Sequence, residues 1–110
     1  MRISGENRRF LLLQGPHGPF FSRLGHMLAR SGAKVLRVGF NRGDRAFWPD
    51  TGSYIPFKGT VEGWPTAFEA MIRDFQITDI VLYGDTRPVH AHAIRIARSA
   101  GLTVHVFEEG

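Results

Sequence analysis

The sequence predicts an α/β protein in which helices flank an open, parallel sheet of four strands. Four short apolar runs are spaced along the chain, as expected of strands that are buried on both faces. Three segments with helical periodicity lie between these runs, and glycine or proline stands at most of the junctions. Strands that alternate with helices in this way pair in parallel through right-handed crossovers.

The first half of the chain holds two of the strands and one helix. Residues 1–9 are expected to form a flexible arm, and the apolar run at residues 10–13 forms the first strand. Pro19 suits the first position of a helix, and Gly32 suits its end. One face of this helix is expected to carry Phe20, Leu24, Met27, Leu28 and Ser31. Residues 34–40 then form the second strand.

The second half holds two more strands, each preceded by a helix. A helix over residues 65–76 is predicted by the i, i+3, i+4, i+7 spacing of Phe68, Met71, Ile72 and Phe75. Residues 80–83 and 102–107 form the third and fourth strands, with a helix of apolar periodicity between them. We expect strand order 2-1-3-4 in a three-layer, Rossmann- or flavodoxin-like domain. Its topological switch point then lies between the first and third strands.

The segment from about residue 41 to residue 64 shows no clear helical period. Loops longer than about 12–15 residues in compact domains are usually functional or disordered. The sequence Phe47-Trp48-Pro49 argues against disorder, because aromatic side chains normally pack. We therefore expect an ordered loop that folds over the edge of the sheet, with Trp48 and Trp64 as packing anchors.

Composition narrows the class of protein and of partner. The 110 residues allow one domain, and the absence of cysteine excludes disulfides and thiolate metal sites. The net charge is +4, but the basic residues are scattered, which favours an anionic small molecule or a membrane surface over nucleic acid. No apolar run approaches the roughly 20 residues of a membrane-spanning helix, and a cytoplasmic protein is expected.

Three turns at the expected carboxyl ends of strands carry the most unusual residues, and open α/β sheets bind ligands outside those ends. The first turn, residues 15–19, includes His17 and Gly18. It can bring backbone N–H groups and a helix N-terminus to an anion, although its two prolines remove donors. The Rossmann and P-loop glycine spacings are absent, so a plain tight turn remains an equal alternative.

The other two turns contain acidic residues. Asp85 and Arg87, with Thr86 between them, suit a catalytic carboxylate and an arginine for a substrate carboxylate or phosphate. Helix capping by Asp85 or Thr86 explains the same residues as well. Glu108 and Glu109 diverge on a strand exit, where one of them can act as a base or nucleophile, or both can be solvated.

The histidines do not form a metal site in this interpretation. His90 and His92 are two residues apart on a helix and point to different faces, while His26 falls on the polar side of the first helix. His105 lies in a strand expected to be buried, where a hydrogen-bonded core residue is the simpler interpretation. We predict neither a metal nor a cofactor.

Six segments in order resemble the amino-terminal part of the bacterial capsular polysaccharide biosynthesis and export proteins of the β-Kdo transferase type. The segments span residues 10–16, 19–21, 35–38, 43–49, 84–88 and 104–110. The resemblance implies a retaining glycosyltransferase of two Rossmann-like halves, GT-B-like in form, with CMP-Kdo as donor. It also implies a phosphatidylglycerol-type lipid acceptor at the inner face of the inner membrane, and contact with the capsule export machinery.

The resemblance also implies roles for individual residues. Glu108-Glu109-Gly110 is similar to an acid-acid-glycine motif in related enzymes, so Glu108 or Glu109 is the favoured catalytic carboxylate and Asp85 the rival. Arg42, Arg45 and Arg87 then meet the Kdo carboxylate or the acceptor phosphate. The chain has no His-Pro pair, the motif that holds the CMP phosphate in the second half. We therefore expect residues 10–110 to be an amino-terminal domain of a longer protein, inactive alone.

Two other functions remain as alternatives. The first is a non-catalytic binding or assembly module of capsule export. The second, a stand-alone flavodoxin-like or response-regulator-like domain, is disfavoured because the first strand does not end in an acidic pair and the last strand has no lysine.

Overall fold

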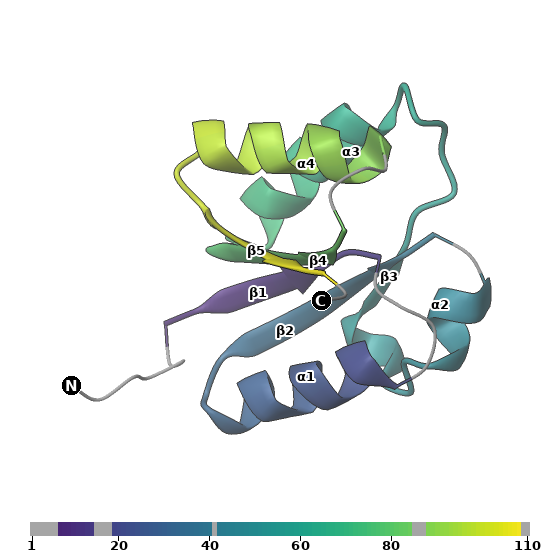
Figure 1. The fold of residues 1–110 in the computed structure, drawn as a ribbon, viewed down its shortest axis with the longest axis vertical. Coiled ribbons are helices and arrows are strands. Elements are labelled where there is room, and N and C mark those ends of the chain that lie inside the picture. The colour runs from purple at the N-terminus through teal and green to yellow at the C-terminus, as the bar shows by residue number, and fades with distance from the viewer. Residues whose placement is uncertain (1–6, 15–18, 41, 85–87, 109–110) are drawn as a thin grey trace.

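The computed structural model describes residues 7–14, 19–40, 42–84 and 88–108, apart from the side chains of residues 42 and 43. The elements in chain order are β1 (Arg9–Leu12), α1 (Phe20–Arg30), β2 (Lys34–Gly39), α2 (Arg42–Ala46), the 3₁₀ helix η1 (Thr51–Ser53), β3 (Tyr54–Pro56), α3 (Trp64–Asp74), β4 (Asp79–Tyr83), α4 (Pro88–Ser99) and β5 (Thr103–Phe107). One parallel sheet of order β3-β2-β1-β4-β5 lies between two helical layers (Figure 1). Helices α1 and α2 lie on one face of the sheet, and α3 and α4 on the other.

The α/β class and the neighbours of the four expected strands are confirmed. The expectation of four strands is wrong, because β3 adds a fifth strand at the edge beside β2. This strand has only three residues, and a run this short that contains a proline is a weak strand signal. It ends at Pro56, a residue that an edge strand tolerates because its missing N–H does not break a central ladder.

The segment at residues 41–64 is therefore not the loop that we expected. It contains α2, η1 and β3, and part of it forms the edge of the sheet. Asp50 begins η1 by accepting a hydrogen bond from the N–H of Gly52. Trp48 Nε1 donates to the Ser53 hydroxyl at 2.9 Å, so the turn and the tryptophan hold each other in place. Helices and strands this short lack the repeated spacing on which periodicity depends.

The larger core lies between the sheet and helices α3 and α4. Trp64 and Phe68 of α3 are fully buried there, against Leu11 and Leu13 from the β1 run. The indole N–H of Trp64 donates to the C=O of Val89 at 2.8 Å and so ties the start of α3 to the start of α4. The indole therefore hydrogen-bonds while its rings fill the core, as expected of a packing anchor.

The smaller core lies on the α1 face of the sheet. Trp48 packs directly over Gly25 of α1, where an added Cβ would lie 2.6 Å from the tryptophan ring. This contact turns Phe21 and Gly25 toward the sheet. The predicted α1 face is therefore partly wrong, because Met27 is 68% exposed and Phe20 is 39% exposed. Gly25 has no side chain, so it does not appear in an apolar pattern, but for the same reason Trp48 can approach α1 closely at this position.

A buried carboxylate ties the amino-terminal ends of the strands together. Asp79, at the start of β4, is 1% exposed and lies 2.6 Å from Arg8 Nη2 and 2.8 Å from His105 Nε2. The Thr78 hydroxyl donates to its other oxygen at 2.6 Å. Burial alone would raise the pKa of Asp79, but hydrogen bonds from His105, Thr78 and Arg8 outweigh it and hold that pKa below its usual value. Asp79 is therefore an ionised structural residue at the end opposite the predicted site.

Candidate functional site

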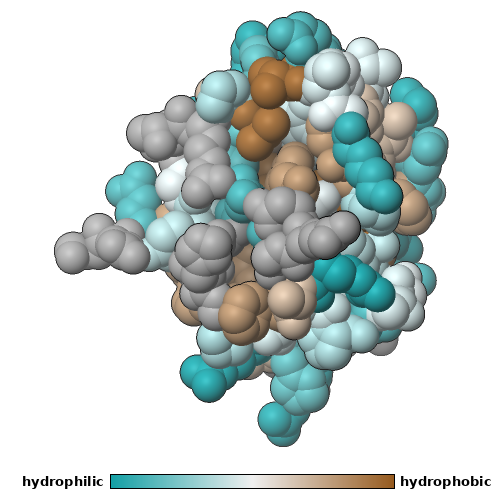
Figure 2. Space-filling view, turned by 90° about the vertical axis from the view of Figure 1, so that its right-hand side faces the viewer, coloured by the Kyte–Doolittle hydropathy of each residue, from teal (hydrophilic) through white to brown (hydrophobic). Residues whose placement is uncertain are grey.

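The carboxyl ends of β1, β4 and β5 lie side by side, as the sequence predicts. The N–H of Tyr83 donates to the C=O of Gln14 at 3.3 Å, and the N–H of Gly84 donates to the C=O of Phe107 at 2.8 Å. Figure 2 faces this end of the molecule, where hydrophilic residues (teal) border smaller hydrophobic areas (brown). Three strand exits therefore open onto the edge at which open α/β sheets bind ligands.

An acidic residue lies beside exposed aromatic rings at the β5 end of this edge. Glu108 directly follows β5 and is exposed. The Phe20 ring meets the Phe107 ring edge-on at 5.5 Å and the Tyr83 ring edge-on at 6.2 Å. Phe20 and Phe107 keep more than a third of their surface exposed. Such rings offer a surface on which a sugar or base can stack at the strand exit that Glu108 follows.

His90 fixes the point at which the chain leaves β4. Its side chain is fully buried in the first turn of α4, and its Nδ1 lies 2.7 Å from the C=O of Gly84. A carbonyl oxygen only accepts hydrogen bonds, so Nδ1 carries the hydrogen. Gly84 itself has a φ of +76°, a backbone conformation that favours glycine. Both residues therefore set the direction in which the chain enters the predicted Asp85 turn.

A buried ion pair lies at the β2 end of the same edge. Arg37 of β2 is 4% exposed and Asp44 of α2 is 9% exposed, with Nη2 and Oδ1 at 3.2 Å. The second oxygen of Asp44 accepts the N–H of Phe40 at 2.7 Å, and the Arg37 guanidinium lies over the ring of Phe21. Burial lowers the pKa of Arg37, although Asp44 opposes this effect. The pair fastens α2 to the end of β2.

The neighbouring arginine on α2 is held differently. The guanidinium of Arg45 lies over the ring of Tyr54 at 5.1 Å, a cation–π contact. Burial and the nearby Asp44 raise the pKa of Tyr54, whereas Arg37 and Arg45 oppose the rise. Tyr54 therefore stays a neutral phenol that can donate a hydrogen bond. Arg45 is exposed and takes part in none of the ion pairs of the described residues, so its guanidinium is accessible to a ligand.

Two of the nine predicted site residues have described side chains, Arg45 and Glu108. They lie at opposite ends of the carboxyl edge, Arg45 beside β3 and Glu108 after β5. Arg42 begins α2, but its side chain is outside the described part. Also outside the described residues are His17, Gly18, Asp85, Thr86, Arg87 and Glu109. The structure thus confirms where the strand ends lie and leaves the roles of these residues as predictions.

Sequence reasoning missed the buried polar residues. In the sequence, Arg37 is one of many scattered arginines, and Asp79 directly precedes an expected strand. Neither position by itself indicated a buried charge. The alternation within β2 places Arg37 on the same face as Val35, which was a usable signal of burial. His105 was expected in a buried strand, whereas 36% of its side chain is exposed. Its expected hydrogen-bond partner is present and is Asp79.

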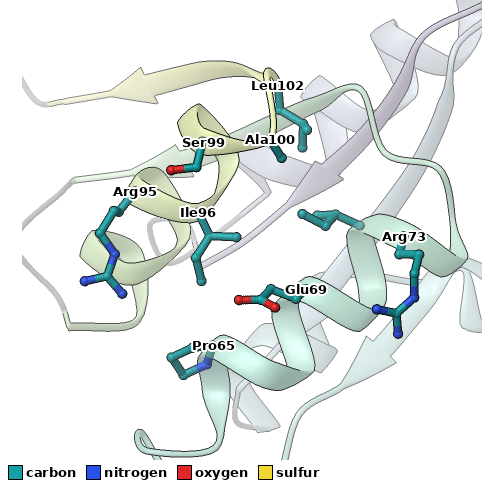
Figure 3. Close-up of a pocket in the computed structure, with 9 residues that line it drawn as sticks. Pro65, Glu69, Arg73, Arg95, Ile96, Ser99, Ala100 and Leu102 are labelled. Carbon is teal, nitrogen blue, oxygen red and sulfur yellow. The ribbon is translucent and has the colours of Figure 1, made fainter.

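A groove of about 670 Å³ runs between α3 and α4 on the outer helical surface. In Figure 3, Glu69 of α3 and Ile96 of α4 face each other across it, with Arg95 and Arg73 at its rims. Its floor is aliphatic, and no residue of the strand exits lines it. The groove therefore does not belong to the carboxyl edge.

Within residues 7–14, 19–40, 42–84 and 88–108, no group of three or more histidine, aspartate or glutamate side chains is placed to hold a metal ion. None of the helices in that part of the chain is both long and apolar enough to cross a membrane.

Comparison with known proteins confirms the resemblance drawn from the sequence. Residues 78–110 match the sequence profile of the family described as capsule polysaccharide biosynthesis protein. The chain is 40% identical over 108 residues to the capsule polysaccharide modification protein LipB of Neisseria meningitidis serogroup A, which covers 97% of this chain and 25% of that protein. It is 37% identical over 105 residues to the capsule polysaccharide export protein KpsS of Escherichia coli, with 96% and 27% covered.

A solved structure supports the Rossmann-like fold. The Bordetella bronchiseptica enzyme WbmH, crystallised in complex with NAD+, aligns with a TM-score of 0.64 over 86% of this chain and 36% of its own. The identity is 14%, so this likeness concerns the fold alone. The chain spans about a quarter of the length of the curated relatives that it matches. By its sequence, the chain belongs to the capsule polysaccharide biosynthesis family.

Proposed function

We propose that this chain is the amino-terminal, Rossmann-like part of a capsular polysaccharide glycosyltransferase. The full-length protein would move Kdo from CMP-Kdo to a lipid-linked acceptor at the inner face of the inner membrane. The observation that carries the proposal is 40% identity to LipB over nearly the whole chain. The carboxyl edge adds support, because it offers a solvent-accessible glutamate beside aromatic rings at one end and cations at the other.

The chemistry expected of this edge is a double displacement. A carboxylate oxygen attacks the anomeric carbon of Kdo, and the bond to the CMP phosphate breaks with its electron pair leaving on CMP. The acceptor hydroxyl then attacks the same carbon and displaces the carboxylate, losing its proton to a base. Two inversions give net retention. Glu108 is the described candidate for the nucleophile, and Glu109 and Asp85 remain its rivals.

The proposal is tested by Kdo transfer with the full-length protein. Glu108→Gln, Glu109→Gln and Asp85→Asn are assayed for transfer from CMP-Kdo to a short-chain lipid acceptor. Replacing the nucleophile is expected to lower kcat by at least about 10³-fold, because the amide cannot form the glycosyl-enzyme ester. Glu69→Gln, in the outer groove between α3 and α4, is the matched control and keeps full turnover. Near-normal turnover in all three acid variants would refute the assignment.

We further propose that the donor nucleotide is held outside this chain, which has no His-Pro pair. The 110-residue chain titrated with CMP or CMP-Kdo is then expected to bind at no better than millimolar affinity. Saturable micromolar binding of CMP would show that the donor site lies here.

A non-catalytic role in capsule assembly is the second candidate, because the name of KpsS describes an export protein. Under this alternative the full-length protein shows no transfer, whereas its removal still blocks capsule at the cell surface. A complementation experiment with the acid variants separates the two functions. Variants without turnover that nevertheless restore surface capsule would support assembly and refute catalysis.

A further inference from the structure

A cavity of about 510 Å³ opens where β2 and β3 end. This volume is in the range of small-molecule sites. Two cations, Arg45 and Lys58, line it, and no acidic residue does. The phenol of Tyr54 and the hydroxyl-bearing Thr51 add polar groups. All of its lining residues belong to the described part of the chain.

Neither cation of this cavity is neutralised by an acid that the structure describes. The ion pairs of the described residues involve neither Arg45 nor Lys58. Three acids lie near these cations in sequence: Glu62 does not line the cavity, and Asp44 and Asp50 are already engaged. Asp44 binds Arg37 and the N–H of Phe40, while Asp50 binds the N–H of Gly52 and the hydroxyl of Ser53. The cavity therefore has an excess of positive charge that favours an anionic ligand.

The position of Tyr54 in this cavity is fixed by its neighbours. A Cβ added to Gly39 would overlap the phenol oxygen of Tyr54, so the ring lies directly over the glycine backbone. The guanidinium of Arg45 covers the same ring at 5.1 Å. Arg45 is nevertheless exposed, and the N–H groups of a guanidinium suit phosphate and carboxylate oxygens. The phenol and the cation are thus positioned before a ligand arrives.

The remaining lining indicates what the anion is attached to. Phe40, Pro56 and Phe57 supply apolar surface, and the hydroxyl-bearing side chains are limited to Tyr54 and Thr51. A sugar acid such as Kdo carries many hydroxyl groups, and burying hydroxyls without partners is costly. A phosphate on a small apolar body would satisfy the cations and leave its apolar part on these rings.

Distance along the sheet separates this cavity from the reacting sugar. The strand order is β3-β2-β1-β4-β5, so four strand spacings lie between β3 and the exit of β5 at Glu108. At roughly 4.8 Å a spacing, these ends are about 19 Å apart. A single sugar ring is far shorter than this span. The anion held by Arg45 is therefore not the carboxylate of a Kdo that reacts at Glu108.

We infer that the cavity lined by Arg45, Tyr54 and Lys58 is an anion-binding pocket for a phosphate group attached to a compact apolar body. If the proposed function holds, the lipid-linked acceptor supplies this phosphate, and that last step rests on the proposed function. The binding step itself does not, because it needs no transfer reaction.

The test measures binding of three probes to the 110-residue chain at fixed ionic strength. Calorimetry gives the affinity, and backbone amide chemical shifts locate the site. The probes are dihexanoyl phosphatidylglycerol below its micellar concentration, inorganic phosphate and Kdo. We expect saturable binding of the short-chain lipid with shifts at Gly39, Tyr54 and Lys58. Inorganic phosphate should bind at least about 5-fold more weakly, because it lacks the apolar body, and Kdo weaker still.

Matched variants separate the pocket from general charge attraction. Arg45→Gln and Lys58→Gln are each expected to weaken lipid binding by about 10-fold, and the double variant should abolish it. Both side chains are exposed, so neither replacement leaves a cavity. Arg23→Gln removes an exposed α1 cation outside the pocket and should leave the affinity unchanged. Thermal unfolding confirms that all variants remain folded.

Several results would overturn the inference. These are equal loss of binding in Arg23→Gln and Arg45→Gln, Kdo bound more tightly than the lipid through the same residues, or equal affinity for inorganic phosphate and the lipid. A chain that binds none of the three probes at millimolar concentration would overturn it as well. If the full-length protein binds the short-chain lipid in this pocket but does not transfer Kdo, the proposed function is refuted and the anion-binding pocket is still supported.

Discussion

Asp79→Asn is the substitution for which the structure predicts the largest change in stability at unchanged volume. The carboxylate is 1% exposed and receives three hydrogen bonds, from Arg8, His105 and Thr78. A hydrogen bond to a charged group contributes about 1.5–3 kcal/mol. The Arg8 and His105 side chains are 45% and 36% exposed, so water can replace part of what they lose. We therefore expect the free energy of unfolding to fall by about 2–4 kcal/mol.

Urea denaturation followed by tryptophan fluorescence measures this change, and the melting temperature should fall by roughly 10–20 °C. Asp74→Asn is the control, because its ion pair with Arg73 is long at 3.5 Å and both side chains are mostly exposed. That substitution should cost less than about 0.5 kcal/mol. Equal effects of the two substitutions would show that the carboxylate of Asp79 contributes no net stability.

The same carboxylate predicts the sign of the pH dependence. The folded-state pKa of Asp79 is lowered, so its contribution is present above the unfolded value of about 4 and is lost as the pH falls through the folded value. The parent chain should therefore lose stability on acidification below about pH 4. Asp79→Asn removes this group, so the loss over the same range should be smaller in the variant.

Two further predictions concern the β2 end of the sheet. Asp44→Ala strands the buried Arg37 cation and should cost about 3–5 kcal/mol in urea denaturation, whereas after Arg37→Met the Asp44 carboxylate keeps the hydrogen bond from the Phe40 N–H, so the cost should be smaller. A cost below about 1 kcal/mol for Asp44→Ala would contradict a stabilising ion pair. Gly39→Ala displaces the Tyr54 ring, so lipid binding in the calorimetric assay should weaken by about 10-fold or more while Gly52→Ala leaves it intact.

The sequence was most informative where apolar residues repeat. The β1 run and the β4 run are continuous apolar segments, and both are central strands as predicted. The α3 face is also right around Phe68, which is fully buried. Prediction failed where a contact between distant segments decides the structure. The packing of Trp48 on Gly25 rotates α1, and nothing in the spacing of the α1 residues announces it.

The candidate site was predictable in position and less so in its members. Parallel topology alone places the exits of β1, β4 and β5 on one edge, which the hydrogen bond between Gly84 and Phe107 confirms. The cavity at the β2 and β3 exits was not predictable in the same way, because β3 is only three residues long and contains a proline. The pairing of β3 with β2 brings Tyr54 beside Arg45 and places Lys58 just after the end of the strand. A prediction that lacks β3 therefore cannot bring these three residues together.

The fifth strand changes which ligand group Arg45 can bind. In a sheet of four strands, a cation after β2 would lie three strand spacings from the β5 exit, so a single ligand would have a shorter distance to span between that cation and Glu108. With β3 in place, Arg45 stacks on Tyr54 at the far edge, about 19 Å from the Glu108 end. Glu108 and Arg45 are too far apart to contact the same sugar ring, so a transferase using both would hold two substrates along this edge. Such a division fits a reaction that joins a sugar to a phosphate-bearing acceptor, because the groups that bind need not be the groups that react.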